Sequence, residues 1–171
     1  MAGSDRQAIS VTYLTGDATA PIGKGHKIIV HVCNDIGKWG KGFVLAISRR
    51  WKAPETQYRA AFAKADKPVL GDVQFVPVDK DITVANLIGQ YGVARSSSKT
   101  APVRYDAIRQ GLEKIATFAK KHHASVHMPR IGCGLAGGSW DRIEPLINDT
   151  LIKEHINTNV YDFDESHGPK R

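Results

Sequence analysis

Hydrophobic residues along the chain gather in short apolar or alternating runs, several of them rich in valine and isoleucine. Such runs are typical of β-strands, and most of these are apolar at successive positions, as in strands that are buried on both faces. The pattern predicts strands at residues 9–14, 27–33, 72–76, 83–88, 125–128 and 159–163.

The segments between these runs carry apolar residues at helical spacing. They predict helices at 43–51, 54–65, 103–122 and 140–155. The clearest stripe is formed by Ile108, Leu112, Ile115 and Ala119, and Pro102 suits the start of that helix. Strands that alternate with helices predict an α/β domain with a mostly parallel sheet covered on both faces. Such a sheet binds ligands at the carboxyl ends of its strands.

Length and composition indicate one domain. The chain has 171 residues, of which 42% are hydrophobic and 24% charged, so separate cofactor and substrate lobes are not expected. We expect one domain over 1–171, with a core at about 9–164, a mobile loop at 92–101 and a frayed tail at 165–171. The apolar runs fall well short of the roughly 20 residues that cross a bilayer. The first residues lack the apolar region of a secretory signal, which predicts a cytoplasmic protein without a membrane partner.

The charge of the chain favours anionic partners. Its formal net charge is +7 and its pI is about 9.5, which suits phosphates. Nucleic acid is one such partner, although no compact basic run or RNA-binding motif accompanies the charge, and a basic solvated surface is the alternative. Cys33 and Cys133 lie far apart without a C-x-x-C pair, which favours reduced thiols over a disulfide or zinc site.

A glycine-rich segment follows the predicted strand at 125–128. Its Gly132-x-Gly134-x-x-Gly137 spacing matches the letters of the dinucleotide-binding fingerprint. The physical reason for that fingerprint applies here too, because glycines let backbone amides approach a diphosphate beside the start of a helix. Too few residues follow for the second half of a dinucleotide-binding fold. A diphosphate site is therefore the preferred interpretation, with a tightly packed turn as the alternative.

A second glycine-rich segment follows the strand at 27–33. Asn34 ends that strand, and Gly40 and Gly42 would let a sugar or phosphate approach the backbone. Asn34 could instead cap a local turn. A nucleoside-triphosphate P-loop is excluded for both Gly-Lys pairs, Gly23-Lys24 and Gly40-Lys41. Neither pair has a glycine five positions before its own glycine, or a Ser or Thr after its lysine. Asp17, just after the first strand, could accept a hydrogen bond from an adenine amine or form an Asx-turn, and Phe163 could stack on a base or lie in the core.

Taken together, these segments resemble the macrodomain family, in the family's order and over nearly the whole chain. The resemblance is closest to the branch that contains terminal ADP-ribose protein glycohydrolase and its bacterial relatives. The segments that carry it are Gly16-Asp17-Ala18-Thr19, Cys33-Asn34 with Gly37-x-x-Gly40-x-Gly42, Asn86-Leu87-Ile88-Gly89-Gln90, the run from Pro129 to Gly138, and Tyr161-Asp162-Phe163-Asp164.

The resemblance implies a three-layer α/β/α fold with a mostly parallel mixed sheet, and a cleft that binds ADP-ribose. It implies that Asp17 holds the adenine amine, with Ala18 beside it and Phe163 flanking the ring. Around the distal ribose it places Asn34, Gly40, Lys41 and Gly42, and around the diphosphate Gly132, Cys133, Gly134, Leu135, Ala136 and Gly137.

The chain differs from the family at the positions of the catalytic residues. The glycohydrolase uses a lysine and an aspartate where this sequence has Gln90 and Ala136, and the larger hydrolase branch has an acid in the first glycine loop, where this chain has Lys38, Trp39 and Lys41. The catalytic candidates that remain are Asn34 and Asp35, with Asp35 as a general base. His31 is expected to be a core histidine. His123 and His127 lack a third ligand, so no metal is expected.

Two classes of function follow. The first is an enzyme that releases ADP-ribose from a conjugate or ester, or removes phosphate from ADP-ribose 1″-phosphate. The second is a module that binds ADP-ribose without turnover, including at ADP-ribosylated nucleic acid. We favour the enzyme, acting as a monomer without a cofactor.

Overall fold

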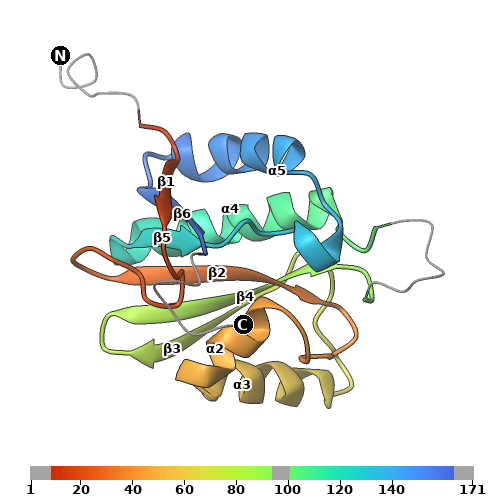
Figure 1. Cartoon of the computed structure of the whole chain (residues 1–171). Helices are drawn as coiled ribbons and strands as arrows, with labels where there is room; N and C mark the ends of the chain where they lie inside the picture. Colours follow the sequence, from red (N-terminus) through yellow and green to blue (C-terminus); the bar gives the residue numbers. More distant parts are fainter. Residues whose placement is uncertain (1–8, 94–100, 164–171) are drawn as a thin grey trace.

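The fold is a mixed six-stranded sheet between two layers of helices (Figure 1). The computed structural model describes residues 9–93 and 101–163. Most of the loop predicted at 92–101, and the whole predicted tail at 165–171, lie outside these ranges. The strands are β1 (Thr12–Thr15), β2 (Lys27–Asn34), β3 (Val73–Asp79), β4 (Ile82–Gln90), β5 (Ser125–Met128) and β6 (Thr158–Asp162).

The sheet order is β1-β6-β5-β2-β4-β3. Every neighbouring pair is parallel except β3 and β4, which are antiparallel. The predicted mostly parallel mixed sheet is therefore confirmed. The parallel strands share one direction, so the loops that follow β2, β5 and β6 meet at one edge of the sheet.

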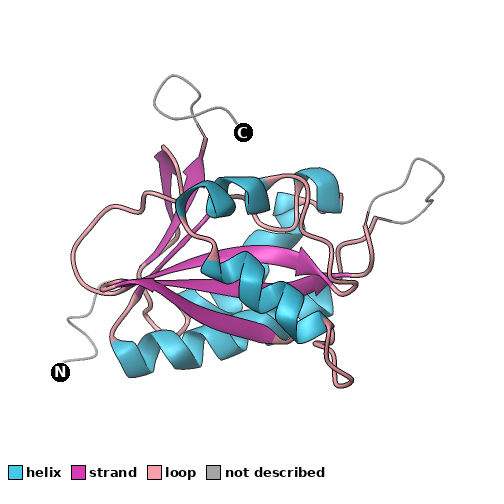
Figure 2. Cartoon of the chain, turned by 90° about the horizontal axis from the view of Figure 1, so that it is seen from below, coloured by secondary structure: helices cyan, strands magenta, loops and turns pink. Residues whose placement is uncertain are grey.

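Helices cover both faces of the sheet. In Figure 1, α2 (Phe43–Arg50) and α3 (Ala53–Phe62) lie below it, and α4 (Tyr105–His122) and α5 (Trp140–Ile147) lie above it. Seen from below, helices cross in front of the strands (Figure 2). This confirms the three-layer α/β/α architecture.

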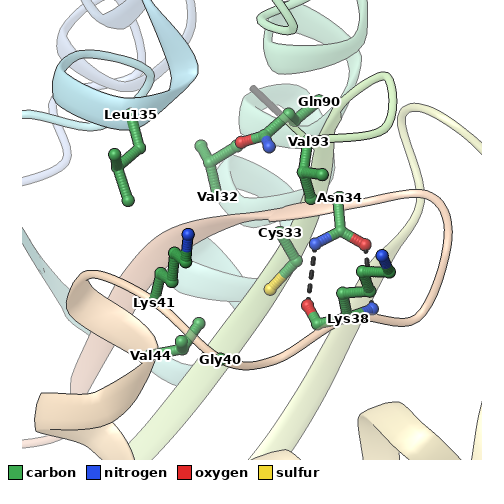
Figure 3. Close-up of a pocket in the computed structure, with 10 residues that line it drawn as sticks. All are labelled: Val32, Cys33, Asn34, Lys38, Gly40, Lys41, Val44, Gln90, Val93 and Leu135. Carbon is green, nitrogen blue, oxygen red and sulfur yellow. Dashed lines mark hydrogen bonds between the residues drawn. The ribbon is translucent and has the colours of Figure 1, made fainter. Parts of the chain in front are cut away.

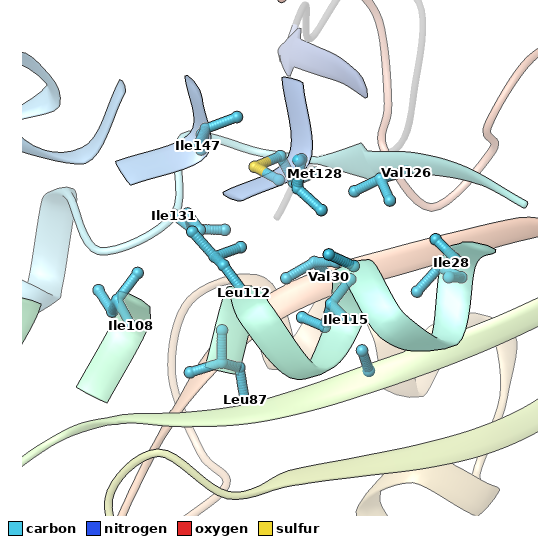
Figure 4. Packing of buried hydrophobic residues seen from close by; sticks show 14 of the residues in the cluster. Ile28, Val30, Leu87, Ile108, Leu112, Ile115, Val126, Met128, Ile131 and Ile147 are labelled. Carbon is cyan, nitrogen blue, oxygen red and sulfur yellow. The ribbon is translucent and has the colours of Figure 1, made fainter. Parts of the chain in front are cut away.

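The central strand β2 divides the core into two halves, because successive side chains point to opposite faces of a sheet. Ile28 and Val30 pack on the α4 side with Leu112 and Ile115 (Figure 4). Ile29 and Cys33 pack in the other half, on the α2 and α3 side. A strand that is buried on both faces therefore fixes the positions of both helical layers.

Most element boundaries differ from the sequence prediction by a few residues, and the differences at the first strand and the last helix have a clear structural cause. The first strand begins at Thr12 instead of Ile9, and among residues 9–93 and 101–163 its one pairing is with β6. The last helix ends at Ile147 and continues as a π-helical segment, Asn148–Ile152, in which Lys153 N donates to Asn148 O at 2.9 Å. An apolar pattern at a period of 3.6 residues does not distinguish such a wide turn from an α-helix.

Two histidines are buried in the core, and both are hydrogen-bonded. His31 Nε2 donates to Asn86 Oδ1 at 2.6 Å, so the expected core position of His31 is confirmed. The ring nitrogens of His127 lie 2.7 Å from Ser125 Oγ and 2.8 Å from the Tyr161 hydroxyl. Burial lowers the pKa of each imidazole to about 4.

Within the described ranges, none of the helices is long and apolar enough to cross a membrane. The same part of the chain holds no group of three or more His, Cys, Asp or Glu side chains that could bind a metal ion.

These histidines predict a loss of stability in acid. Their folded pKa values of about 4 lie below the reference value of 6.5, so the unfolded chain binds more protons between these two pH values. The stabilisation is complete above pH 6.5 and falls as the pH drops toward 4, by at most about 3 kcal/mol for each histidine. Denaturant unfolding across this range measures it.

His123→Asn is the matched control for that measurement. His123 is exposed and has a φ of 51°, a conformation that asparagine tolerates. The variant should keep the same dependence on pH, whereas His127→Gln should reduce it. An unchanged dependence in His127→Gln would contradict the assignment.

Candidate functional site

Two adjoining cavities lie where the loops after β2, β4, β5 and β6 meet. Cavity A has a volume of about 340 Å³ and is lined by Val32, Cys33, Asn34, Lys38, Gly40, Lys41, Val44, Gln90, Val93 and Leu135 (Figure 3). Cavity B has a volume of about 520 Å³, and its walls add His31, Gly42, Phe43, residues 129–134, Ala136 and residues 161–163. Val32, Lys41, Val44, Gln90 and Leu135 line both, so the two cavities form one cleft.

The first glycine-rich loop is held by the side chain of Asn34. Its Nδ2 donates to Lys38 O at 2.7 Å, while its Oδ1 accepts from the backbone N–H groups of Ile36 and Lys38, each at 3.1 Å. The Tyr58 hydroxyl lies 2.7 Å from both Oδ1 and the backbone oxygen of Asn34. Asn34 therefore shapes the loop through a local turn, and its amide oxygen is already saturated with donors.

Asp35 follows Asn34 and makes a structural contact with the segment after β4. Its Oδ1 accepts a hydrogen bond from Gly92 N at 2.8 Å, and among the described residues it lines neither cavity A nor cavity B. This contact ties the first glycine loop to the segment after β4. The structure thus assigns Oδ1 of Asp35 a structural contact, and its predicted role as a general base stays a prediction.

The second glycine-rich loop forms the opposite wall. Residues 132–136 line cavity B, and η1 (Gly134–Ala136) is a single 3₁₀ turn. Gly138 N donates to Gly132 O at 2.7 Å, and a Cβ on Gly138 would lie only 2.2 Å from that oxygen. This close approach explains a glycine at 138. Gly137 is not among the described residues that line either cavity.

Leu135 joins the two loops across the cleft. Its side chain is 56% exposed, and its Cδ1 would lie 3.4 Å from a Cβ on Gly42. An apolar side chain therefore lies where cavities A and B adjoin.

Asp17 forms the local turn that the sequence left open. Its Oδ1 accepts from the backbone N–H of Thr19 at 2.8 Å and from the Thr19 hydroxyl at 2.7 Å. Neither Asp17 nor Ala18 is among the described lining residues of the two cavities. The turn nevertheless adjoins the end of β6, because Gly16 N donates to Asp162 O at 2.8 Å. Phe163, which follows β6, lines cavity B.

Sequence reasoning missed the pairing of Arg130 with Asp162 in the wall of cavity B. Arg130 donates to the two carboxylate oxygens at 2.7 and 3.0 Å, and this bidentate contact lowers the pKa of Asp162. The guanidinium also lies over the rings of Tyr13 and Trp140, at 5.0 and 5.1 Å. The available signal was the position of both residues just at the ends of predicted strands.

Gln90, which the sequence comparison placed at the position of the glycohydrolase's lysine, lines both cavities. Its Nε2 donates to Gly92 O at 2.8 Å, which fixes the orientation of the amide. The oxygen faces the space between Val32 and Leu135 (Figure 3). Gln90 thus offers a hydrogen-bond acceptor to both cavities.

The two cysteines of the cleft are protonated thiols at neutral pH. Cys33 lines cavity A and Cys133 lines cavity B. Burial raises the pKa of each thiol. Because the thiolate is the nucleophilic form, these cysteines are poor candidates for covalent catalysis.

A search against family models found no match. Among solved structures, a protein of unknown function from Bacteroides thetaiotaomicron is 54% identical, with a TM-score of 0.88 over 91% of this chain and 99% of that one. A macrodomain protein from Streptomyces coelicolor is 52% identical, with a TM-score of 0.80 over 93% of this chain and 100% of the other.

The chain belongs to the macrodomain family. The predicted membership is therefore confirmed, and the cleft described above lies in a macrodomain fold.

Two curated relatives of this macrodomain differ in how much of their own length the chain spans. A mouse chromodomain-helicase-DNA-binding protein 1-like is 34% identical over 97% of this chain, and the chain spans only 19% of that relative's length. An ADP-ribose 1″-phosphate phosphatase from Lodderomyces elongisporus is 25% identical over 91% of this chain and 100% of its own length.

The hydroxyl of Tyr58 is expected to stabilise the first glycine loop of this macrodomain. Tyr58→Phe removes the donor to Asn34 and should lower the free energy of unfolding by about 1–2 kcal/mol. It should also speed hydrogen exchange at the Ile36 and Lys38 amides. Denaturant unfolding and exchange measured by NMR test both effects.

Tyr91→Phe provides the control, because Tyr91 is exposed and its hydroxyl has no hydrogen bond within the described part of the chain. Equal exchange rates in the wild type and in Tyr58→Phe would contradict the role assigned to Tyr58.

Proposed function

We propose that this macrodomain binds ADP-ribose in the cleft and hydrolyses a bond to its distal ribose. The observation that carries the proposal is the continuity of cavities A and B between two glycine-rich loops. A dinucleotide-like ligand needs an elongated cleft where backbone amides can approach its phosphates. The similarity to an ADP-ribose 1″-phosphate phosphatase over that protein's full length supports the same ligand.

In this proposal, the distal ribose lies in cavity A and the diphosphate in cavity B. Residues 132–136 surround the diphosphate, opposite the amino end of α2. That helix has no acidic residue in its first turn, which leaves its positive end favourable for an anion. The adenine lies beyond cavity B, beside Phe163 and within reach of the Asp17–Ala18 turn.

The proposed chemistry uses Gln90 in preference to Asp35. A fixed amide oxygen can accept a hydrogen bond from a water molecule and direct the water's lone pair at the anomeric carbon of the distal ribose. As the water oxygen bonds to that carbon, the bond from the carbon to the leaving group breaks, and the leaving group takes the bonding electron pair. The proton that the water loses passes to solvent, because the amide cannot take it. Lys38 and Lys41 line cavity A, and their positive charges would favour a leaving group that departs as an anion. Such a leaving group needs no proton from the protein. Asn34 acts on the reaction by shaping the loop.

One observation favours binding without turnover as a second candidate. Among the described residues that line the cavities, the single carboxylate is Asp162, and it is paired with Arg130. The walls therefore offer no unpaired carboxylate as a general base. Product analysis after incubation with ADP-ribose derivatives distinguishes the two candidates.

The net charge of +7 also suits ADP-ribose that is attached to nucleic acid. The proposal therefore includes ADP-ribosylated nucleic acid as a ligand, and the dependence of its affinity on salt tests this part. The affinity for such a conjugate should fall more steeply with salt than the affinity for free ADP-ribose.

Filling cavity A should abolish ligand binding without unfolding the protein. Gly40 lines this cavity, and a Cβ there would meet no atom within 4 Å. Gly40→Val should therefore weaken ADP-ribose binding at least tenfold in calorimetric titration and leave the unfolding midpoint nearly unchanged. Full affinity in a folded Gly40→Val variant would contradict the proposed location of the ligand.

Removing the amide of Gln90 should separate binding from turnover. We expect Gln90→Ala to reduce the hydrolysis rate at least tenfold while the Kd for ADP-ribose changes less than about threefold, because the amide acts on the water. Single-turnover kinetics and titration on the same samples measure the two quantities. Unchanged turnover would remove Gln90 from the mechanism.

A further inference from the structure

The turn after β1 is held by a side chain from the carboxyl end of α2. Arg50 is the last residue of that helix, and its Nε donates to the Thr19 hydroxyl at 2.7 Å, across a separation of 31 residues. Its Nη2 lies 3.9 Å from Oδ2 of Asp17. One arginine therefore contacts the side chains of both Asp17 and Thr19.

The hydrogen bonds of this turn run in one direction. A guanidinium N–H can only donate, so the Thr19 oxygen accepts from Arg50 and donates its own hydrogen to Oδ1 of Asp17, at 2.7 Å. The backbone N–H of Thr19 donates to the same Oδ1 at 2.8 Å. Two donors on Oδ1, with the guanidinium beside Oδ2, fix the plane of the Asp17 carboxylate.

The second oxygen of that carboxylate keeps its capacity for a donor. Among residues 9–93 and 101–163, Oδ2 accepts no hydrogen bond, because Arg50 stands too far away at 3.9 Å. The side chain of Asp17 is only 12% exposed. An acceptor that is largely shielded from water and not filled by the protein suits a donor on a ligand.

The turn lies beside the end of cavity B at which the proposed function places the adenine. Gly16 N donates to Asp162 O at 2.8 Å, and a Cβ on Gly16 would lie 3.6 Å from the ring of Tyr161. Tyr161 and Asp162 both line cavity B. The exocyclic amine of adenine is a hydrogen-bond donor of the kind that Oδ2 of Asp17 can accept.

Stabilisation of the helix end does not explain the reach of Arg50. A basic side chain in the last turn interacts favourably with the helix dipole, and Arg49 supplies such a charge from the same turn. Arg49 is exposed and makes no hydrogen bond or ion pair within the described part of the chain. The contact of Arg50 with Thr19 is therefore specific to the turn after β1.

We propose that Arg50 is a positioning residue for recognition of the base. Acting through Thr19, it holds Oδ2 of Asp17 toward the exocyclic amine of a purine, so that the cleft selects a 6-aminopurine over a 6-oxopurine. This inference rests on the proposed binding of ADP-ribose. It gives α2 a function at its carboxyl end, in addition to the anion-favouring amino end.

Calorimetric titration with ADP-ribose and with IDP-ribose, in which a carbonyl oxygen replaces the exocyclic amine, tests the inference. The wild type should bind ADP-ribose more tightly by about tenfold or more, because two acceptors would face each other in the other complex. Arg50→Ala should reduce this preference to below about threefold, since the carboxylate is no longer held in one orientation. A purely structural role would weaken the binding of both ligands alike and leave their ratio unchanged.

Two further substitutions show how Arg50 acts. Thr19→Val removes the hydroxyl between Arg50 and Asp17, so it should lower the preference as much as Arg50→Ala does, and the double variant should lose no more than either single variant. Arg49→Ala is the matched control, because it removes the same charge from the same turn of α2 and should keep the full preference. Thermal unfolding checks that each variant is folded.

The outcomes separate the inference from the proposed function. Equal affinity of the wild type for the two ligands, or an unchanged preference in folded Arg50→Ala, would overturn the inference and leave the binding of ADP-ribose standing. An equal loss in Arg49→Ala would assign the effect to charge alone, and additive losses in the double variant would exclude the route through Thr19, so either would also overturn it. Absence of binding of both ligands by the wild type would overturn the proposed function and the inference together.

Discussion

The hydrogen bonds that converge on Asn34 determine the shape of the site. This side chain satisfies two backbone N–H groups and one carbonyl of the loop that follows β2, while Tyr58 reaches it from α3. A loop that leaves a central strand must satisfy its polar groups without a neighbouring strand. Here the amide of Asn34 satisfies three of them, at Ile36 and Lys38, while Gln90 O accepts from Asp35 N and Arg59 donates to Trp39 O. Asn34, which the sequence placed beside the distal ribose, therefore holds the loop that lines the cleft.

The sequence predicted the layers and the order of the elements well. Apolar runs such as 27–33 predict strands reliably, because a strand that is buried on both faces needs apolar side chains at nearly every position. The glycine segments after β2 and β5 likewise indicated the two walls of the cleft. The first strand and the last helix were placed less well, since an edge strand has one partner and a π-helical segment leaves the apolar period almost unchanged.

The side-chain partners of the site were beyond sequence reasoning. Asp35 bonds Gly92, Tyr58 bonds Asn34, and Arg130 pairs with Asp162, over separations of 57, 24 and 32 residues. Such pairs depend on how the strands are ordered in the sheet, and no local pattern encodes that order. The contact of Asp35 with Gly92 could therefore not be foreseen from the sequence, which indicated only a carboxylate beside a glycine-rich loop.

The sheet order has a consequence for how the protein responds to a ligand. The walls of the cleft come from segments after β2, β4, β5 and β6, which are distant in sequence and adjacent only when the sheet is complete. A partly folded chain cannot assemble such walls piecemeal. A ligand of the cleft binds only the native state, and by mass action its free energy of binding is added to the stability of the whole domain. The fraction of protein with ligand in the cleft therefore determines how often the domain unfolds. When the ligand is scarce, the domain is more susceptible to proteolysis.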